Sequence, residues 1–427
     1  MVNFSLQWHI TQKCQNRCRH CYMDEQAYDL TYEEYLECIN NITNFEKQND
    51  FSVTMVALTG GDPLLNTDWY KIASDLKHRN KKVMLLGNPE CLTIENLKRI
   101  AQLSISRYQL SIDGMLEKHD YIRSRGSFNR TVEAIKKLNE YKIPIGVMFT
   151  VSDYNVSDLF NVIDFLDCLN IELLFAFDFV ISTGNAKQNH LKFTLNKDKL
   201  YNKFFCVKKQ LINKNSPVKL AEKPTTMWVY KNYKRFSESL LKYVPYETCE
   251  GCGAGIRHLT IINRGDVLAC RRMPVKVGNL FENRFSDILL NSPFLKKLRD
   301  FENMGNCSSC IFQKFCRGCP ADIYAKYGQP FIKNNNCEWH IKKRAKYNKY
   351  ENEIDKLYHS FYGLDMHFAE IKDYIKALFY LNSSGECKKF LLNINDWMKG
   401  HDIFLDDEKI FSLLYLILQK SPTENEI

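Results

Sequence analysis

The sequence predicts an α/β fold whose first half contains a parallel sheet. Six apolar, strand-like runs alternate with helical patterns in this part of the chain. Connections of that length and periodicity are typical of helical crossovers between parallel strands. The alternation by itself fits a doubly wound sheet, a barrel or part of a barrel.

The predicted elements follow one another along the chain. Strand-like runs lie at residues 4–10, 52–58, 82–88, 107–112, 143–151 and 171–180. Helical patterns lie at 32–48, 67–80, 93–103, 127–141 and 156–169. Thr31 and Glu34 have the spacing of a capping box, in which each side chain accepts the other residue's backbone N–H. That pair predicts that the first helix begins directly after Thr31.

Composition limits the class of protein. At 427 residues and 45% hydrophobic, the chain can bury a large core over two or three domains. We find no apolar run of ~18 residues and no signal-peptide pattern, so we expect a cytoplasmic protein with no membrane partner. Sixteen cysteines in such a chain indicate metal binding or catalysis rather than disulfides. The net charge of +9 suits an acidic partner without demonstrating one, and we expect no nucleic-acid partner.

Cys14, Cys18 and Cys21 lie on one short segment directly after the first predicted strand. Three thiolates at these spacings can hold three irons of a 4Fe–4S cluster. Because such a cluster normally has four cysteine ligands, the fourth iron would stay open for chemistry, as one position does on a catalytic zinc. The alternatives are a structural cluster or a zinc knuckle that lacks one ligand.

This cysteine segment resembles the signature of the radical SAM family, in which S-adenosylmethionine (SAM) chelates the open iron through its amino and carboxylate groups. His20 matches the aromatic position of that signature. The resemblance covers about residues 4–190. It implies a partial (β/α)6 barrel with the cluster at the C-terminal ends of the strands.

The segments after the other strands carry the rest of the resemblance. Gly60-Gly61-Asp62-Pro63 looks like the family's Gly-Gly-Glu-Pro motif, which holds the SAM ammonium, although a simple turn has the same composition. Asp62 is one methylene shorter than the family's Glu. The segment from Ser111 to Arg123 resembles the one that contacts the SAM ribose and carboxylate. The resemblance implies SAM contacts at Tyr22, Gly60, Gly61, Asp62, Pro63, Asn88, Ser111, Asp113, Arg123 and Val151.

From Cys249 onward the cysteine order resembles the SPASM domain, which binds auxiliary 4Fe–4S clusters. The resemblance implies a first auxiliary cluster at Cys249, Cys252, Cys270 and Cys319, and a second at Cys307, Cys310, Cys316 and Cys337. The chain departs from the pattern by having only two residues between Cys316 and Cys319. With SAM, the expected cofactors are three 4Fe–4S clusters, one SAM-binding and two auxiliary. Zinc ligation by the Cys-x2-Cys pairs is the alternative.

These motifs divide the chain into four predicted regions. They are a radical SAM partial barrel at 1–190, a helical bridge at 191–248, a SPASM domain at 249–340 and a helical C-terminal extension at 341–427. Cys38, Cys91, Cys168, Cys206 and Cys387 belong to no motif, and we expect them to be buried, unliganded thiols.

The resemblance implies an oxidoreductase that matures a peptide. It would cleave SAM reductively to a 5′-deoxyadenosyl radical and take a hydrogen from an unactivated carbon of the peptide. The auxiliary clusters would accept the electron left on the substrate. The product would be a thioether or carbon–carbon cross-link in a ribosomally made peptide. The partners implied are a precursor peptide and a reductant such as flavodoxin or ferredoxin, and no general base can be assigned.

Two other functions compete with this one. A maturase that forms formylglycine in sulfatases commonly has an Asp base at the position of Arg271, which argues against that function. A non-catalytic iron–sulfur or zinc scaffold is the second alternative. Because the first strand begins at Phe4, we expect no N-terminal leader-binding domain. An acidic leader would then be held elsewhere, for example by the basic residues between 342 and 349, unless these only solvate a helix.

Overall fold

A computed structural model describes residues 2–23, 28–223, 227, 251–262, 264–300, 303–305 and 316–332. The chain divides into two units, and all helices and strands named below belong to the first, Met1–Met227, Cys252–Gly305 and Cys319–Ile332. The second unit is Trp228–Gly251, Asn306–Gly318 and Lys333–Ile427, almost all of it outside the described residues. The expected ligands Cys249, Cys307, Cys310 and Cys337 and the basic run at 342–349 fall there and stay predictions.

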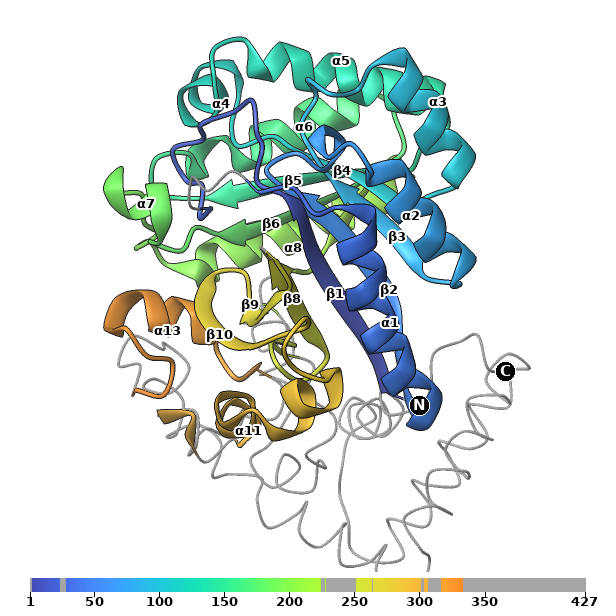
Figure 1. The fold of residues 1–427 in the computed structure, drawn as a ribbon. Coiled ribbons are helices and arrows are strands. Elements are labelled where there is room, and N and C mark those ends of the chain that lie inside the picture. Colours follow the sequence, from blue (N-terminus) through green and yellow to red (C-terminus); the bar gives the residue numbers. More distant parts are fainter. Residues whose placement is uncertain are drawn as a thin grey trace, which may run out of the picture. The chain divides into compact units, whose positions relative to one another are not determined.

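One ten-stranded sheet runs through the first unit, in the order β10-β9-β8-β1-β2-β3-β4-β5-β6-β7 (Figure 1). Its strands are β1 (Val2–Thr11), β2 (Phe51–Gly60), β3 (Lys82–Leu86), β4 (Arg107–Ser111), β5 (Ile145–Val151), β6 (Leu173–Phe179), β7 (Val218–Ala221), β8 (His258–Ile262), β9 (Asp266–Cys270) and β10 (Met273–Asn279). Strands β1 to β7 pair in parallel, β8 pairs in parallel with β1, and β9 and β10 are antiparallel.

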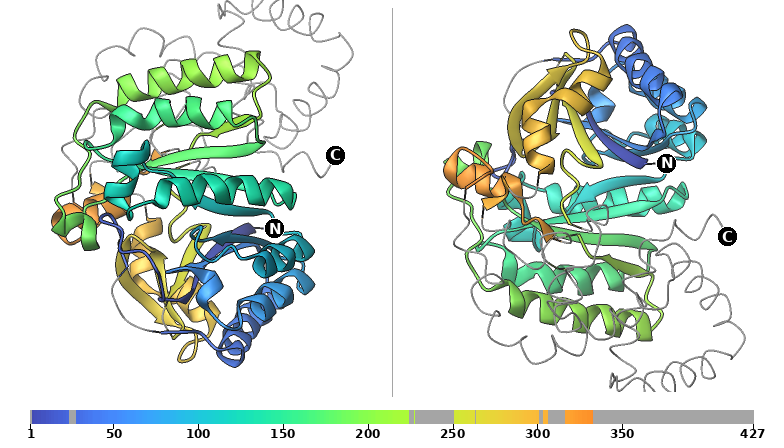
Figure 2. Two further views of the ribbon diagram at one scale, coloured as in Figure 1. Left: turned by 90° about the horizontal axis from the view of Figure 1, so that it is seen from above. Right: turned by 90° about the horizontal axis from the view of Figure 1, so that it is seen from below.

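The strand order decides between the architectures that the sequence left open. Strands β1 to β7 lie side by side in chain order, without the reversal that defines a doubly wound sheet. Right-handed crossovers that always step in one direction place their helices on one face of the sheet. The other face is then enclosed by the curling sheet, so the fold is a partial barrel. Figure 2 shows the crossover helices flanking the sheet from two further directions.

The five helices predicted between residues 32 and 169 are confirmed, whereas the helical extension expected at 341–427 lies outside the described residues. The first unit contains α1 (Tyr32–Gln48), α2 (Trp69–His78), α3 (Ile94–Leu103), α4 (Leu116–Ile122), α5 (Ser127–Glu140), α6 (Leu159–Cys168), α7 (Gly184–Gln188), α8 (Lys197–Asn213), α11 (Pro293–Arg299) and α13 (Pro320–Tyr327). The capping box of α1 is complete: Thr31 Oγ1 accepts from Glu34 N at 3.2 Å, and Glu34 Oε2 accepts from Thr31 N at 3.0 Å. Within the described part of the chain, no helix is both long and apolar enough to cross a membrane.

Two expectations need correction. The region expected to be a helical bridge also contains strand β7, where Val218 and Leu220 are buried and Lys219 between them is exposed. Cys38 and Cys91 are buried as expected, but Cys168 and Cys206 are exposed. Cys206 lies off the buried stripe of α8, and Cys168 is the last residue of α6. Cys387 lies outside the described residues.

Strand alternation separates an apolar outer face from a polar inner one. On β1, Leu6, Trp8 and Ile10 are buried in the core, whereas Gln7 and His9 between them point to the opposite face. On β4, Tyr108 and Leu110 are fully buried and Gln109 and Ser111 face the interior of the barrel. The inner face of the partial barrel is therefore equipped to bind a polar ligand.

Candidate functional site

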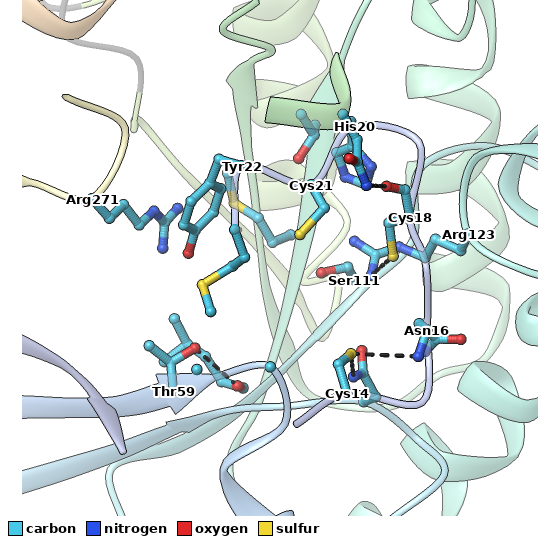
Figure 3. A pocket seen from close by; sticks show the side chains of 18 of the residues that line it. Cys14, Asn16, Cys18, His20, Cys21, Tyr22, Thr59, Ser111, Arg123 and Arg271 are labelled. Carbon is cyan, nitrogen blue, oxygen red and sulfur yellow. Dashed lines mark hydrogen bonds between the residues drawn. The ribbon is translucent and has the colours of Figure 1, made fainter. Parts of the chain in front are cut away.

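A cavity of about 450 Å³ opens on the inner side of the sheet, where strands β2 to β6 end (Figure 3). Its walls come from the cysteine segment after β1, from the strand-end loops and from the turn between β9 and β10. The residues that line it include Cys14, Cys18, His20, Cys21, Tyr22, Thr59, Gly60, Gly61, Asn88, Gln109, Ser111, Arg123, Met148, Thr150, Asp178, Asn185, Arg271 and Arg272. A cavity of this size lies within the range of roughly 300–1,000 Å³ typical of small-molecule sites.

The three thiols of the cysteine segment all line this cavity. The sulfur of Cys14 accepts hydrogen bonds from Asn16 N and Asn88 Nδ2, both at 3.4 Å. The guanidinium of Arg123 lies 3.8 Å from Cys18 Sγ. Donors directed at cysteine sulfurs are one of the means by which proteins tune iron–sulfur clusters. The donor set therefore fits a cluster ligated by Cys14, Cys18 and Cys21.

The metal-free thiols are poor acids in this setting. Burial raises the pKa of Cys18 to about 11, with Arg123 opposing the shift and the neighbouring Cys21 and Cys14 adding to it. Burial likewise raises the pKa of Cys14. Because metal ligands must be thiolates, iron has to displace these protons when it binds. The arrangement suits a metal site better than a free nucleophile.

The two glycines after β2 hold the cysteine segment in place. A Cβ atom at Gly60 would lie 1.9 Å from Thr11 O, and one at Gly61 would lie 2.0 Å from Lys13 O. Gly61 N and Asp62 N donate to these same two carbonyls, at 3.1 and 2.8 Å. No side chain fits between the two loops, so glycine is required for this contact as well as for approach to a ligand.

The start of α7 also holds the cysteine segment, through hydrogen bonds to its backbone. Asn185 N donates to Cys21 O at 2.8 Å, and Asn185 Nδ2 donates to Cys18 O at 3.1 Å. Gly184 has a φ of +51°, and a Cβ atom there would lie 2.6 Å from Cys21 O. The loop after the sixth strand thus positions the cysteines through their backbone.

In the structure, Asp62 lies behind the cavity lining, and its expected contact with SAM stays a prediction. Its side chain is fully buried, is not among the cavity-lining residues, and accepts from Leu64 N at 3.0 Å and from Asn88 N at 3.1 Å. Burial raises the pKa of Asp62 to about 6, while these two N–H groups oppose the shift. The carboxylate thus caps its own turn and joins it to the segment after β3. Pro63 and Val151 are also buried away from the cavity.

Asp113 is likewise buried behind the wall, where it anchors three residues that line the cavity. Its Oδ2 lies 2.6 Å from Arg123 Nε and 3.4 Å from His20 Nε2, and its Oδ1 accepts from Thr150 N at 2.7 Å. Burial alone would raise the pKa of Asp113, but Arg123 and then His20 lower it below its ordinary value. Burial also lowers the pKa of His20 to about 4, so that His20 is neutral near pH 7.

The turn between β9 and β10 brings the second cysteine-rich region to the same cavity. Arg271 donates to Gln7 Oε1 at 3.1 Å and lies over the Tyr22 ring, 5.2 Å from its centroid. Arg272 forms an ion pair with Asp178 at 3.2 Å. Burial would raise the pKa of Asp178, and Arg272 and Lys223 bring it below its ordinary value. Cys270, an expected auxiliary ligand, directly precedes both arginines.

Three of the four cysteines expected at the first auxiliary cluster interact electrostatically with Arg272. Burial raises the pKa of Cys319 to about 12, with Arg272 opposing and Cys252 and Cys270 adding to the shift. No group of three or more His, Cys, Asp or Glu within the described ranges is arranged to hold a single metal ion. Of the second expected set only Cys316 is described, and it is buried.

Several residues of the site were not predicted from the sequence. They are Gln7, His9, Asp178, Lys223 and Arg272. The period of two along β1 and β6 could have assigned Gln7, His9 and Asp178 to the inner face, because each lies between apolar residues of its strand. Lys223 and Arg272 lie outside those strands and give no such signal.

Comparison with known proteins identifies two segments. Residues 8–166 match the radical SAM superfamily, and residues 252–311 match the SPASM iron–sulfur cluster-binding domain. An AdoMet-dependent heme synthase of Methanosarcina barkeri is 27% identical over 331 residues, covering 75% of this chain and 92% of that protein. The antilisterial bacteriocin subtilosin biosynthesis protein AlbA of Bacillus subtilis is 25% identical over 352 residues, covering 77% of this chain and 69% of AlbA.

A solved structure shares the fold. Streptococcus suis SuiB bound to S-adenosylmethionine superposes with a TM-score of 0.64 at 17% identity, covering 79% of this chain and 77% of SuiB. At that identity the likeness concerns the fold alone. It agrees with the partial barrel derived above from the strand order.

Proposed function

This chain belongs to the radical SAM superfamily and carries a SPASM iron–sulfur domain, and on that premise we propose that it is a maturase acting oxidatively on a ribosomally made peptide. Support comes from AlbA, a bacteriocin biosynthesis protein, and from the structure of SuiB bound to the precursor peptide SuiA. The modification would be a thioether or carbon–carbon cross-link. The proposal keeps the cytoplasmic location expected from the sequence and a flavodoxin or ferredoxin as electron donor.

The residues present fit the implied cofactors. Cys14, Cys18 and Cys21 would hold the SAM-binding 4Fe–4S cluster, and Asn88 and Arg123 would direct hydrogen bonds at their sulfurs. When bound, the cluster and SAM together supply a 5′-deoxyadenosyl radical that removes hydrogen from an unactivated carbon. The chain's own part is to hold the cysteine segment rigid, through Gly61, Asp62 and Asn185, and to surround the reacting atoms with a walled cavity.

The observation that carries the proposal is that one cavity is lined by both cysteine-rich regions. Cys14, Cys18 and Cys21 lie in its wall, and Arg271 and Arg272, which directly follow Cys270, complete that wall. We propose that an auxiliary cluster at Cys249, Cys252, Cys270 and Cys319 accepts the electron left on the substrate. We propose three clusters in all, the third at Cys307, Cys310, Cys316 and Cys337.

A second candidate is a reaction on a tetrapyrrole, because an AdoMet-dependent heme synthase is 27% identical across 92% of its length. The cavity favours the peptide. Its volume of about 450 Å³ lies in the lower half of the usual range for ligand sites, and SAM would occupy much of it. The remaining room suits one inserted side chain better than a whole macrocycle.

Formylglycine formation and a non-catalytic scaffold are less well supported. Arg271 lies in the cavity wall at the position where the sulfatase-type maturases commonly have an acidic base, and a guanidinium cannot accept a proton near neutral pH. A scaffold would not need a cavity that joins two cysteine-rich regions. Both alternatives remain distinguishable by experiment.

The experiment that tests this function supplies both substrate classes in parallel. Anaerobically reconstituted, reduced protein is given SAM with the short peptides encoded beside its gene, and separately with a propionate-bearing iron porphyrin. We expect one peptide to lose two hydrogens by mass spectrometry and the porphyrin to stay unchanged. A porphyrin product with all peptides unchanged would replace this function with the second candidate.

A further inference from the structure

The charges around the cavity are unbalanced. Its lining contains five permanent cations and one carboxylate, that of Asp178; the cations are Lys13, Arg17, Arg123, Arg271 and Arg272. A cavity lined by one sign of charge attracts ligands of the opposite sign.

Most of these cations are neutralised by the protein itself. Lys13 pairs with Asp29, Arg123 with Asp113, and Arg272 with Asp178. Among the described residues, Arg17 and Arg271 have no carboxylate within ion-pair distance. Arg17 is exposed on the cysteine segment, whereas Arg271 is half-buried in the cavity wall.

The neighbours of Arg271 fix its position without neutralising it. One of its terminal nitrogens donates to Gln7 Oε1, and its face lies over the Tyr22 ring. Gln7 Nε2 lies 3.3 Å from His9 Nε2, so this amide is oriented from both ends. Burial, followed by the charge of Arg271, lowers the pKa of His9 to about 3 and that of His258 to about 4. Both rings are therefore neutral, and the remaining guanidinium N–H groups have no anionic partner in the part of the chain that the structure describes.

Lys223 adds a second cation next to the cavity lining. Its ammonium lies 3.4 Å from Met148 Sδ, and Met148 lines the cavity. Lys223 as a whole residue is exposed, but its ammonium is enclosed. This burial is the larger cause that lowers the pKa of Lys223, and the charge of Arg271 is the second. Of the described carboxylates, only that of Asp178 opposes this charge, and Asp178 already pairs with Arg272. A ligand carboxylate would relieve the repulsion between Lys223 and Arg271.

We propose that Arg271, supported by Lys223, binds a carboxylate of the substrate, so that the peptide segment entering the cavity carries an Asp or Glu near its reacting residue. This inference rests on the proposed peptide function and names its substrate class more closely. In Figure 3, Arg271 and Tyr22 lie on one side of the cavity, and Cys18 and Arg123 lie across from them. Arg123, beside the cysteine sulfurs, is the cation placed for SAM, which leaves Arg271 for the substrate.

The test selects peptides by binding rather than by turnover. Short random peptides, each containing one cysteine, are selected on the immobilised, cluster-loaded protein in the presence of SAM, and the bound pool is sequenced. A charge-assisted hydrogen bond in a walled site changes affinity by about tenfold or more, so we expect Asp and Glu to be enriched about tenfold over Asn and Gln. Arg271→Lys should keep part of this preference, and Arg271→Gln should lose it.

Charge reversal distinguishes recognition from misfolding. Arg271→Glu should select Lys- and Arg-bearing peptides instead, a gain that a damaged fold cannot produce. The matched control is Arg99→Glu on α3, a change at an exposed arginine far from the lining, which should select the same pool as the parent. Equal enrichment of acidic and amide residues by the parent, or the same pool from Arg271→Glu, would overturn the inference. SAM cleavage measured on the same preparations reports separately whether the proposed radical function holds.

Discussion

Replacing Cys14, Cys18 and Cys21 together with alanine is expected to remove about one third of the protein's iron and to abolish SAM cleavage. Three of the eleven proposed ligand cysteines belong to this set, and they alone leave an iron open to SAM. The eight others would keep two complete clusters, about eight of twelve irons. Iron and sulfide analysis after anaerobic reconstitution gives the stoichiometry, and chromatography of the reaction products gives the activity.

A single exposed cysteine outside the motifs serves as control. Cys168→Ala changes an exposed thiol at the end of α6 and should keep all of the iron and the full rate. If the triple variant kept the parent's iron, the ligand assignment would be wrong. If zinc rather than iron filled the later cysteines after anaerobic preparation, the auxiliary clusters would have to be abandoned.

The second large effect is expected at Arg123, whose loss leaves Asp113 as a buried, unpaired charge. Arg123 and Asp113 are 12% and 0% exposed, and removing one partner of such a pair costs about 3–5 kcal/mol. We therefore expect Arg123→Gln to lower the free energy of unfolding by about that amount. Anaerobic denaturant unfolding of the cluster-loaded proteins at pH 7 measures the difference.

The pH dependence of this variant has a definite sign. In the parent, Asp113 has a lowered pKa, so its contribution to stability is present above the ordinary pKa of Asp and is lost as pH falls through the lowered value. Without Arg123, burial raises the pKa of Asp113, so as pH falls the folded variant binds a proton at a higher pH than the unfolded chain does. The difference in free energy of unfolding between the parent and Arg123→Gln should therefore become smaller as pH falls toward the ordinary pKa of Asp. The control is Arg99→Gln, which breaks the exposed ion pair with Glu95 and should lower the free energy of unfolding by less than about 1 kcal/mol. If Arg123→Gln lowered it by no more than this control, the assigned role of the buried pair would be wrong.

Local sequence signals predicted the elements well because those elements are determined locally. The capping box of Thr31 and Glu34 sets the start of α1, and apolar runs set the parallel strands. The partial barrel could not be derived from the same pattern, because strand order is a property of pairing between distant segments. The contribution of β8 to the same sheet, through its pairing with β1, depends on residues about 250 positions apart, such as Ser5 and His258.

The site likewise contains features that local sequence determines and features that depend on contacts between distant segments. The spacing of Cys14, Cys18 and Cys21 was informative by itself, since one short loop carries all three. The surroundings of Asp62 could not be predicted in the same way, because its side chain accepts from Leu64 N in its own turn and from Asn88 N on a distant segment. The contact between Gln7 and Arg271 spans 264 positions and appears only once the sheet has formed. Sequence alone marked Arg271 only as a departure from a family pattern.

The central claim is that this chain cleaves SAM at the cluster held by the cysteine segment. The most direct measurement is the formation of 5′-deoxyadenosine when the anaerobically reconstituted protein is reduced with dithionite in the presence of SAM. The account predicts 5′-deoxyadenosine from the parent protein and none from the triple cysteine variant. Iron-replete parent protein that yields no more 5′-deoxyadenosine than that variant would contradict it.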